Sequence, residues 1–108
     1  MLYRVKKDKA LKMIKQVTAI DPKLLKIRSK VELFKGVDKN RFIAIIGVKQ
    51  KSRILMKDMA KFEDIVEKMS HYVNHTFDAK QLIVDAPMCS KASKAMKDNG
   101  WDIVDATV

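Results

Sequence analysis

The chain has 108 residues and a formal net charge of +10, with 23 Lys and Arg against 13 Asp and Glu. This length accommodates one domain, residues 1–108, and excludes a multidomain enzyme, a TIM barrel and a full dinucleotide-binding fold. Because 47% of the residues are hydrophobic, the chain can bury a core, which a disordered polycation cannot do.

The first predicted elements are a short strand and a helix. Leu2–Val5 is a candidate strand. A helix is predicted from Lys9 to Ala19, because apolar residues recur there at a spacing of three and four and Asp8 is a suitable N-cap. Pro22 follows shortly after, and the residue before a proline avoids the helical region, so the helix is expected to end there.

The next part of the chain predicts an antiparallel meander of three strands. Leu24–Phe34 alternates apolar and charged residues, which is typical of a half-buried strand. Gly36–Asn40 has the composition of a turn. Arg41–Lys49 is apolar on both faces in its middle, which indicates a central strand. After a second turn, Arg53–Lys57 is expected to return as the third strand.

The last part of the chain predicts two helices and two strands. A helix beginning at Asp58 as its N-cap carries the clearest three-and-four spacing of apolar residues, and the short apolar strand Lys80–Asp85 follows. Pro87 suits the first turn of another helix, which ends before Gly100. Trp101–Ala106 is the last strand. The order predicts an α+β fold, a small antiparallel sheet with helices packed on one face.

The charge is not distributed evenly. Residues 1–57 carry 17 Lys and Arg against 4 Asp and Glu, a balance of +13, whereas residues 58–108 have a balance of −3. Concentrated positive charge is typical of nucleic-acid-binding proteins. We expect Lys26, Arg28 and Lys30, with other basic residues, to line the sheet face that the helices leave uncovered. The predicted nucleic-acid-binding residues are Lys26, Arg28, Lys30, Lys39, Arg41, Lys49, Lys51 and Arg53.

Signals for export or membrane insertion are missing from the sequence. The single cysteine, Cys89, has no partner for an internal disulfide, and lysines interrupt residues 1–15 too often for a signal peptide. The longest apolar run, residues 42–48, is far shorter than the roughly 20 residues of a membrane helix. We expect a cytoplasmic protein with no membrane partner.

A metal site is the first chemical alternative to nucleic-acid binding. Glu67, His71 and His75 lie at a spacing of four residues and therefore along one stripe of a helix. This stripe is opposite the apolar one, so it is expected to face water. We expect no metal and no cofactor, although the sequence leaves open whether His71 and His75 bind a metal ion.

Two enzymatic alternatives are also weak. A nuclease needs clustered carboxylates for Mg²⁺ and a lysine, and Glu32, Lys35 and Asp38 are the nearest approach to this pattern. Cys89 at a helix start could have a lowered thiol pKa, but the residue is expected to pack in the core. No glycine pattern for phosphate binding or a nucleophile elbow is present. The sequence therefore predicts a protein that is not an enzyme.

One stretch, about residues 31–76, resembles the second half of a PUR repeat. The resemblance is carried by Arg41-Phe42-Ile43, Lys51-Ser52-Arg53-Ile54 and Met59-Ala60 followed by Phe62. It implies a curved antiparallel sheet, backed by a helix, that binds single-stranded nucleic acid. The contacts it implies are Arg41, Phe42, Lys51 and Arg53. The leading helix and the tail from Lys80 depart from the paired-repeat architecture of that family.

These observations favour a small non-enzymatic nucleic-acid-binding protein with a regulatory role, which contacts phosphates through the basic meander. Single-stranded nucleic acid is the favoured ligand, and the acidic C-terminal half could face a protein partner. A homodimer is compatible with the exposed edge of a small sheet. The alternative is a protein-interaction module or inhibitor that docks on an acidic partner protein. The sequence does not distinguish DNA from RNA, and it gives no sequence specificity or pathway.

Overall fold

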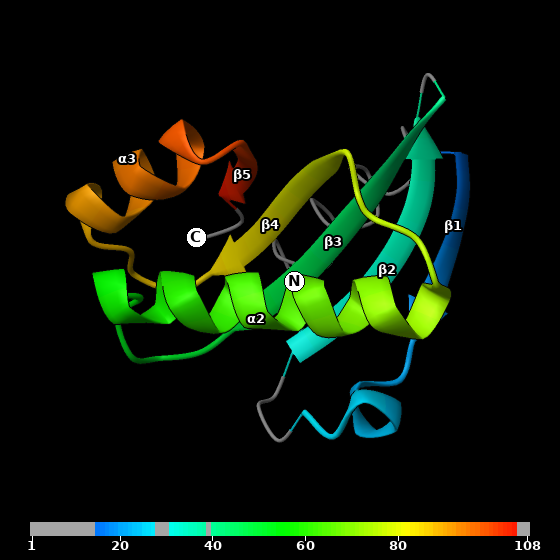
Figure 1. Ribbon diagram of the computed structural model, residues 1–108. Coiled ribbons are helices and arrows are strands. Elements are labelled where there is room, and N and C mark those ends of the chain that lie inside the picture. Colours follow the sequence, from blue (N-terminus) through cyan, green and yellow to red (C-terminus); the bar gives the residue numbers. More distant parts are fainter. Residues whose placement is uncertain (1–14, 28–30, 39, 106–108) are drawn as a thin grey trace.

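The fold was examined in a computed structural model, which describes residues 15–27, 31–38 and 40–105 (Figure 1). The α+β class is confirmed, because one sheet and two α-helices make up most of these residues. In chain order the elements are β1 (Lys15–Ile20), the 3-10 helix η1 (Pro22–Leu25), β2 (Val31–Asp38), β3 (Arg41–Lys49), α2 (Met56–Val73), β4 (Ala79–Asp85), α3 (Ser90–Asp98) and β5 (Trp101–Asp105).

The five strands form one sheet in the order of the chain, β1-β2-β3-β4-β5. The strands β1, β2 and β3 pair antiparallel, whereas β3, β4 and β5 pair parallel. The sheet is therefore mixed rather than antiparallel throughout. Parallel pairing follows from the helices α2 and α3, each of which returns the chain to the end of the sheet where the previous strand began. The prediction that β3 is a central strand is confirmed, since it lies between β2 and β4.

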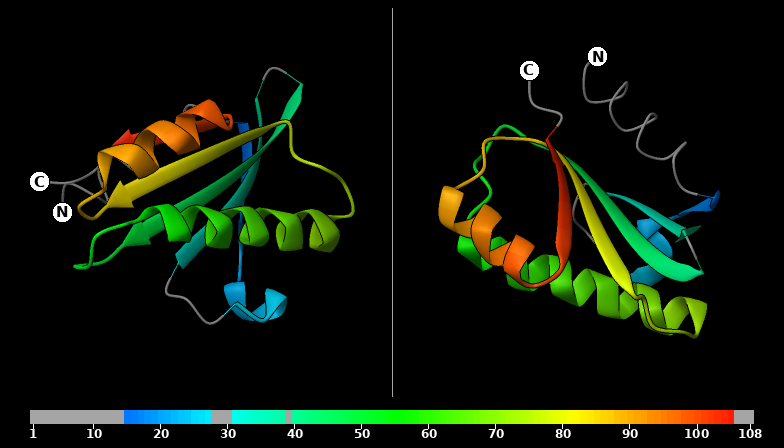
Figure 2. Two further views of the ribbon diagram at one scale, coloured as in Figure 1. Left: turned by 60° about the vertical axis from the view of Figure 1, so that its left-hand side comes forward. Right: turned by 90° about the horizontal axis from the view of Figure 1, so that it is seen from above.

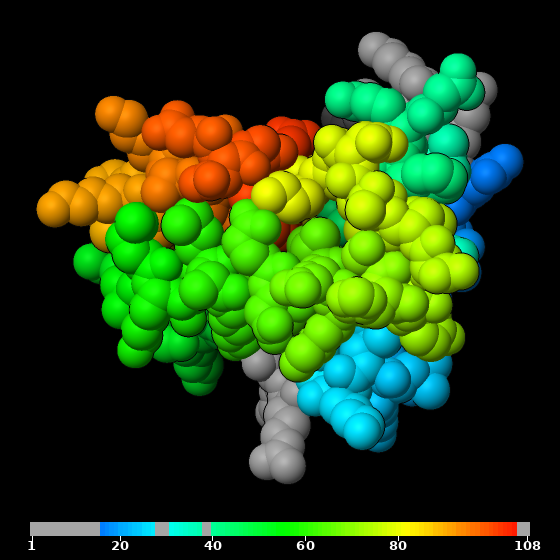
Figure 3. All heavy atoms as spheres, viewed as in Figure 1, coloured from blue at the N-terminus to red at the C-terminus, as the bar shows by residue number. Residues whose placement is uncertain are grey.

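Both α-helices pack on the same face of the sheet, as predicted (Figure 2). Phe62 and Met69 from α2 and Met96 from α3 are buried against the sheet residues Ile46 and Leu82. Figure 3 shows the two helices lying next to each other over this face, α2 in green and α3 in orange. The main hydrophobic core therefore lies between the sheet and its two helices.

The predicted helix Lys9–Ala19 is wrong in its last part. Residues 15–20 form the edge strand β1, which pairs with β2 and contains an irregularity where Gln16 has a φ of 55°. The β-branched residues Val17, Thr18 and Ile20 suit a strand, and pairing with β2 outweighs the helical spacing of the apolar residues. The rest of this helix and the predicted strand Leu2–Val5 lie outside the described residues.

The predicted strand Leu24–Phe34 is also wrong at its start. Pro22–Leu25 forms η1, which the Asp21 side chain caps by accepting a hydrogen bond from the Lys23 N–H at 3.0 Å. The strand β2 runs from Val31 through Asp38, so it includes the first three residues of the turn predicted at Gly36–Asn40. The chain reverses after Asp38, within the predicted range, where Asn40 adopts a left-handed φ of 66°.

The predicted third strand, Arg53–Lys57, is not formed. Within it only Ile54 makes a β-bridge, which pairs with Met88, and α2 already begins at Met56. The predicted N-cap Asp58 lies inside α2, where its Oδ2 accepts a hydrogen bond from the Leu55 N–H at 2.8 Å. The third strand of the meander is therefore β1.

The remaining predictions of strands and helices hold except at two helix ends. The helix α2 ends at Val73, so His75 lies beyond the helix on which it was predicted. The strands β3, β4 and β5 are confirmed within one residue at each end, and α3 ends before Gly100, which has a φ of 88°. The start of α3 is at Ser90 rather than at Pro87. No helix among the described residues is long and apolar enough to cross a membrane.

The face of the sheet opposite the helices is apolar at its centre, which contradicts the expectation of a basic face. Phe34, Ile43, Ile45 and Ile83 form a second hydrophobic cluster there, and Ile45 and Ile83 have no exposed surface. Lys26 lies on the turn after η1 and not on the sheet, while Arg28 and Lys30 lie outside the described residues. The centre of this face therefore offers no surface for phosphates.

Candidate nucleic-acid interface

The carboxyl ends of the parallel strands lie at one edge of the sheet. At this edge the chain leaves β3 and begins α2, and later leaves β4 and begins α3 (Figure 1). Ligands of open sheets with parallel strands commonly bind at this edge. The N–H groups at the start of a helix give that end a partial positive charge, which attracts anions. The backbone of this edge is therefore suited to an anionic ligand.

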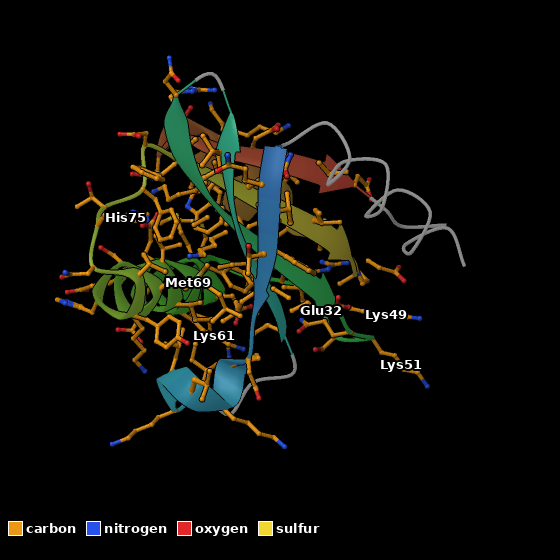
Figure 4. All side chains as sticks on the ribbon, turned by 90° about the vertical axis from the view of Figure 1, so that its right-hand side faces the viewer. Glu32, Lys49, Lys51, Lys61, Met69 and His75 are labelled. Atoms are coloured by element: carbon orange, nitrogen blue, oxygen red, sulfur yellow. The ribbon has the colours of Figure 1, made fainter. Side chains whose placement is uncertain are left out.

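Five exposed cations gather at this edge, which we call the basic edge. Three of them, Lys49, Lys51 and Arg53, belong to the predicted set and lie at the end of β3 and in the loop that follows. The other two, Lys57 and Lys91, occupy the second position of α2 and of α3. Figure 4 shows that Lys49 and Lys51 project from the sheet end toward solvent. Between residues 49 and 57 the sequence contains no Asp or Glu, although Asp85 is the strand neighbour of Lys49 at this edge.

The loop that carries Lys51 and Arg53 is held by backbone hydrogen bonds to the segment that follows β4. The Ile54 N–H donates to the carbonyl of Pro87 at 2.8 Å, and the Cys89 N–H donates to the carbonyl of Ile54 at 3.0 Å. The Gln50 N–H donates to the carbonyl of Asp85 at 3.1 Å. The side chain of Ile54 is fully buried and anchors the loop in the core. The cations therefore extend from a fixed backbone.

The lowered thiol pKa of Cys89 indicates that the basic edge is electrostatically positive. The structure leaves this residue half-buried at the start of α3, rather than packed in the core as predicted. The backbone amides of Ala92 and Lys91 lower the pKa of the Cys89 thiol, and the positive charge of Arg53 acts in the same direction. Each of these groups stabilises the negatively charged thiolate. The environment between the start of α3 and the β3–α2 loop therefore favours an anion.

The eight predicted binding residues do not form a single surface. Lys26 follows η1, and η1 contacts α2. This contact is distant from the start of α2 (Figures 1 and 3), so Lys26 is not part of the basic edge. Arg41 starts β3 and is about 27 Å from Lys49 at the other end, by the rise of a strand. Lys39, like Arg28 and Lys30, lies outside the described residues.

Phe42, a contact implied by the PUR resemblance, lies at the start of β3 beside Arg41. Its side chain is 41% exposed and its ring stacks on the ring of His75, with the centroids 3.9 Å apart. The Phe42 N–H donates to Asp78 Oδ2 at 3.0 Å. This end of β3 therefore presents an aromatic pair. The resemblance implies that Phe42, Lys51 and Arg53 all contact the ligand, but Phe42 lies at the opposite end of β3 from the two cations.

The three residues of the proposed metal stripe do not converge on one point. His71 Nε2 lies 3.9 Å from Glu67 Oε1, and both side chains are largely exposed. The ring of His75 packs instead between Phe42 and Phe77. Over the described parts of the chain, no group of three or more His, Cys, Asp or Glu residues is placed to hold a metal ion.

Sequence reasoning missed Lys91, and it placed Lys57 at the end of the predicted third strand rather than in a helix. Lys91 lies in a region predicted as helix, where it resembles any exposed helix lysine. The signal that would have found Lys91 is topological, because it follows a helix start that comes after a parallel strand. That inference requires knowing that β3 and β4 run parallel.

Comparisons with known proteins show a likeness of fold only. No family model matches the sequence, and no curated protein matches it. A solved structure of EndoMS in its apo form matches 93% of this chain with a TM-score of 0.56 and 10% sequence identity. The match covers 42% of the EndoMS chain, so this chain spans less than half the length of that protein.

Proposed function

We propose that this protein binds nucleic acid through its basic edge and catalyses no reaction. The observation that carries the proposal is the gathering of five exposed cations around two helix starts, two of them, Lys51 and Arg53, on a loop held by hydrogen bonds to its neighbour. Lys and Arg side chains at such positions bind phosphates and displace the counterions of the polyanion. A regulatory role, and a homodimer joined through the edge strand β1 or β5, belong to the same proposal.

The resemblance of residues 31–76 to a PUR repeat supports a single strand as the preferred ligand. Two of the contacts that it implies, Lys51 and Arg53, lie on the basic edge. A single strand is more flexible than a duplex, so it can follow cations that are spread over one strand end and two helix starts. This preference gives the proposal a definite probe, a labelled single-stranded oligonucleotide.

The test of the proposal is the salt dependence of binding. Five phosphate contacts to a single strand predict a slope of about −3.5 in a plot of log affinity against log salt, or a loss of about 100-fold between 50 and 200 mM. Fluorescence anisotropy with a labelled oligonucleotide measures both quantities. An affinity that does not change with salt contradicts the proposal. Polyglutamate that binds as tightly as the oligonucleotide supports the alternative, docking on an acidic partner protein.

A second candidate function is magnesium-dependent cleavage of a phosphodiester. It is favoured by three side chains on the face of the sheet opposite the helices, which we call the second face. Glu32 pairs with Gly47, and Lys49 pairs with Asp85, so all three charged residues share that face at the same end of the sheet. Figure 4 shows Glu32 near Lys49. The sequence had grouped Glu32 with Lys35, but the odd spacing places Lys35 on the helix-covered face.

In such a reaction, Glu32 and Asp85 would hold the ion together with a phosphate oxygen of the substrate, since Mg²⁺ is commonly bound by one or two carboxylates and substrate phosphates. Lys49 would stabilise the negative charge that develops on the phosphate. A water oxygen forms a bond to phosphorus while the bond from phosphorus to the leaving sugar oxygen breaks. The water releases a proton, and the leaving oxygen takes one up from solvent.

Incubation of labelled DNA with the protein and millimolar Mg²⁺ or Mn²⁺ distinguishes the two functions. If the protein is a nuclease, the strand is cut, and Glu32→Gln or Asp85→Asn lowers the rate by at least about 100-fold. Lys35→Gln is the matched control, because it changes a charged residue of β2 on the opposite face and leaves cleavage intact. DNA that stays whole with both ions supports binding without catalysis.

A further inference from the structure

The basic edge contains two large apolar side chains that the core does not use. Leu55 is 39% exposed and Met56 is 45% exposed, and they follow each other in the chain between Arg53 and Lys57. We call this pair the apolar tip. Single exposed apolar residues are common on protein surfaces. Two adjacent exposed apolar residues within the cations of the proposed binding site are less common than single exposed apolar residues.

The apolar tip is held in its exposed position from both sides. On one side Ile54 is fully buried and bridges to Met88, so the core position is already filled. On the other side α2 begins at Met56, and the Leu55 N–H donates a hydrogen bond to the carboxylate of Asp58. The side chains of Leu55 and Met56 therefore cannot turn inward without breaking these contacts.

We propose that Leu55 and Met56 contact the bases of the bound nucleic acid while Arg53 and Lys57 hold the phosphates on either side. This inference rests on the proposed function and names the part of the ligand that the site recognises. Leu and Met side chains that insert between bases are a known means of base contact, and burial of their apolar surface against a base is favourable. The flanking cations select a polyanion over an uncharged apolar partner.

The ligand class that fits this arrangement is a strand with unpaired bases. Bases of a duplex present their faces only after they have been unstacked, whereas bases of a single strand are accessible to the apolar tip from the start. The inference therefore gives a second and independent reason to expect a single strand, one that rests on exposed residues rather than on the PUR resemblance.

The test uses the full chain and a single-stranded oligonucleotide that contains 2-aminopurine, a base whose fluorescence depends on stacking. The wild-type protein is expected to change this fluorescence on binding. The variant Leu55→Gln/Met56→Gln is expected to lose most of that change and to bind about 10-fold more weakly. Its salt slope stays that of the wild type, because no cation has been removed.

The variant Leu24→Gln/Tyr72→Gln is the matched control, because it removes two apolar side chains that are 60% and 51% exposed elsewhere on the surface. It is expected to behave as the wild type. If the double variant at the tip does not fold, Met56→Gln alone carries the test, since glutamine is a good helix former.

Three outcomes decide between the inference and its rivals. If the tip variant binds as tightly as the wild type and produces the same fluorescence change on binding, the base contact is overturned. The proposed function then still stands on its salt dependence. A wild-type protein that binds no oligonucleotide overturns both. Binding to phosphatidylserine vesicles in preference to the oligonucleotide, lost in the tip variant, assigns the apolar tip to a lipid surface and overturns the inference.

Discussion

Replacing Lys49, Lys51 and Arg53 together by glutamine is expected to weaken binding of a single-stranded oligonucleotide by on the order of 100-fold at low salt. The three cations project from one fixed stretch of chain and account for most of the charge at the basic edge. Each phosphate contact contributes about 0.7 to the salt slope, so the slope is expected to fall by about two. Anisotropy titrations at several salt concentrations give both numbers.

The matched control for this experiment removes the same charge elsewhere. Lys23, Lys26 and Lys68 are exposed, and Lys68 pairs with Asp64 at 3.3 Å on the surface of α2. Such surface pairs contribute little to stability, so both triple variants are expected to remain folded. Equal losses of affinity in the two variants would show that net charge alone attracts the ligand and would contradict a defined basic edge.

The substitution Ile45→Ala is expected to lower the free energy of unfolding by about 3 kcal/mol. Ile45 lies in the middle of β3 on the second face, has no exposed surface and packs in one cluster with Ile43 and Ile83. Loss of three buried carbon atoms removes favourable burial and leaves a cavity, because the neighbouring strands relax only partly. Urea denaturation followed by circular dichroism measures the change.

This substitution also decides between the two faces of the sheet. The sequence predicted that the face away from the helices binds phosphates, and a binding surface tolerates small changes without loss of stability. Leu24→Ala serves for comparison, since its side chain is 60% exposed and its loss is expected to cost less than about 0.5 kcal/mol. An Ile45→Ala variant that is as stable as Leu24→Ala and only binds more weakly would contradict a buried second face.

The elements that the sequence predicted well have signals within their own residues. The continuous apolar run of Arg41–Lys49 requires burial on both faces, which only a central strand provides. The stop after α3 needs a residue that tolerates a positive φ, and Gly100 supplies it. For such elements, local sequence is sufficient.

The elements that the sequence predicted wrongly depend on partners distant in the chain. Residues 15–20 fit a helical and an extended spacing of apolar residues equally well, and pairing with β2 selects the strand. Arg53–Lys57 is a short apolar run, Ile54-Leu55-Met56, between two cations, and such a run suits a strand as well as the approach to a helix. In the structure β4 and not this segment pairs with β3. The side chain of Ile54 is buried in either arrangement, so its apolar character does not distinguish them.

The residues of the candidate site also differ in whether local sequence was enough to predict them. Charge along the chain was enough to identify Lys49, Lys51 and Arg53, because they follow one another in a short stretch. Lys57 follows them in the chain, although in α2 and not in the predicted strand. Lys91 joins them only through the parallel order of β3 and β4, which brings two helix starts to one edge. Lys26 and Arg41 have the same charge but are carried to other parts of the surface by η1 and by the length of β3.

The hydrogen bonds that join Ile54 to Pro87 and to Cys89 have a thermodynamic consequence for binding. A flexible basic loop must be ordered when its ligand arrives, and the lost backbone entropy subtracts from the affinity. Here the two loops are joined when the chain folds, so their backbone entropy has already been lost in the free protein. Association with a polyanion then has to order only the ends of the lysine and arginine side chains.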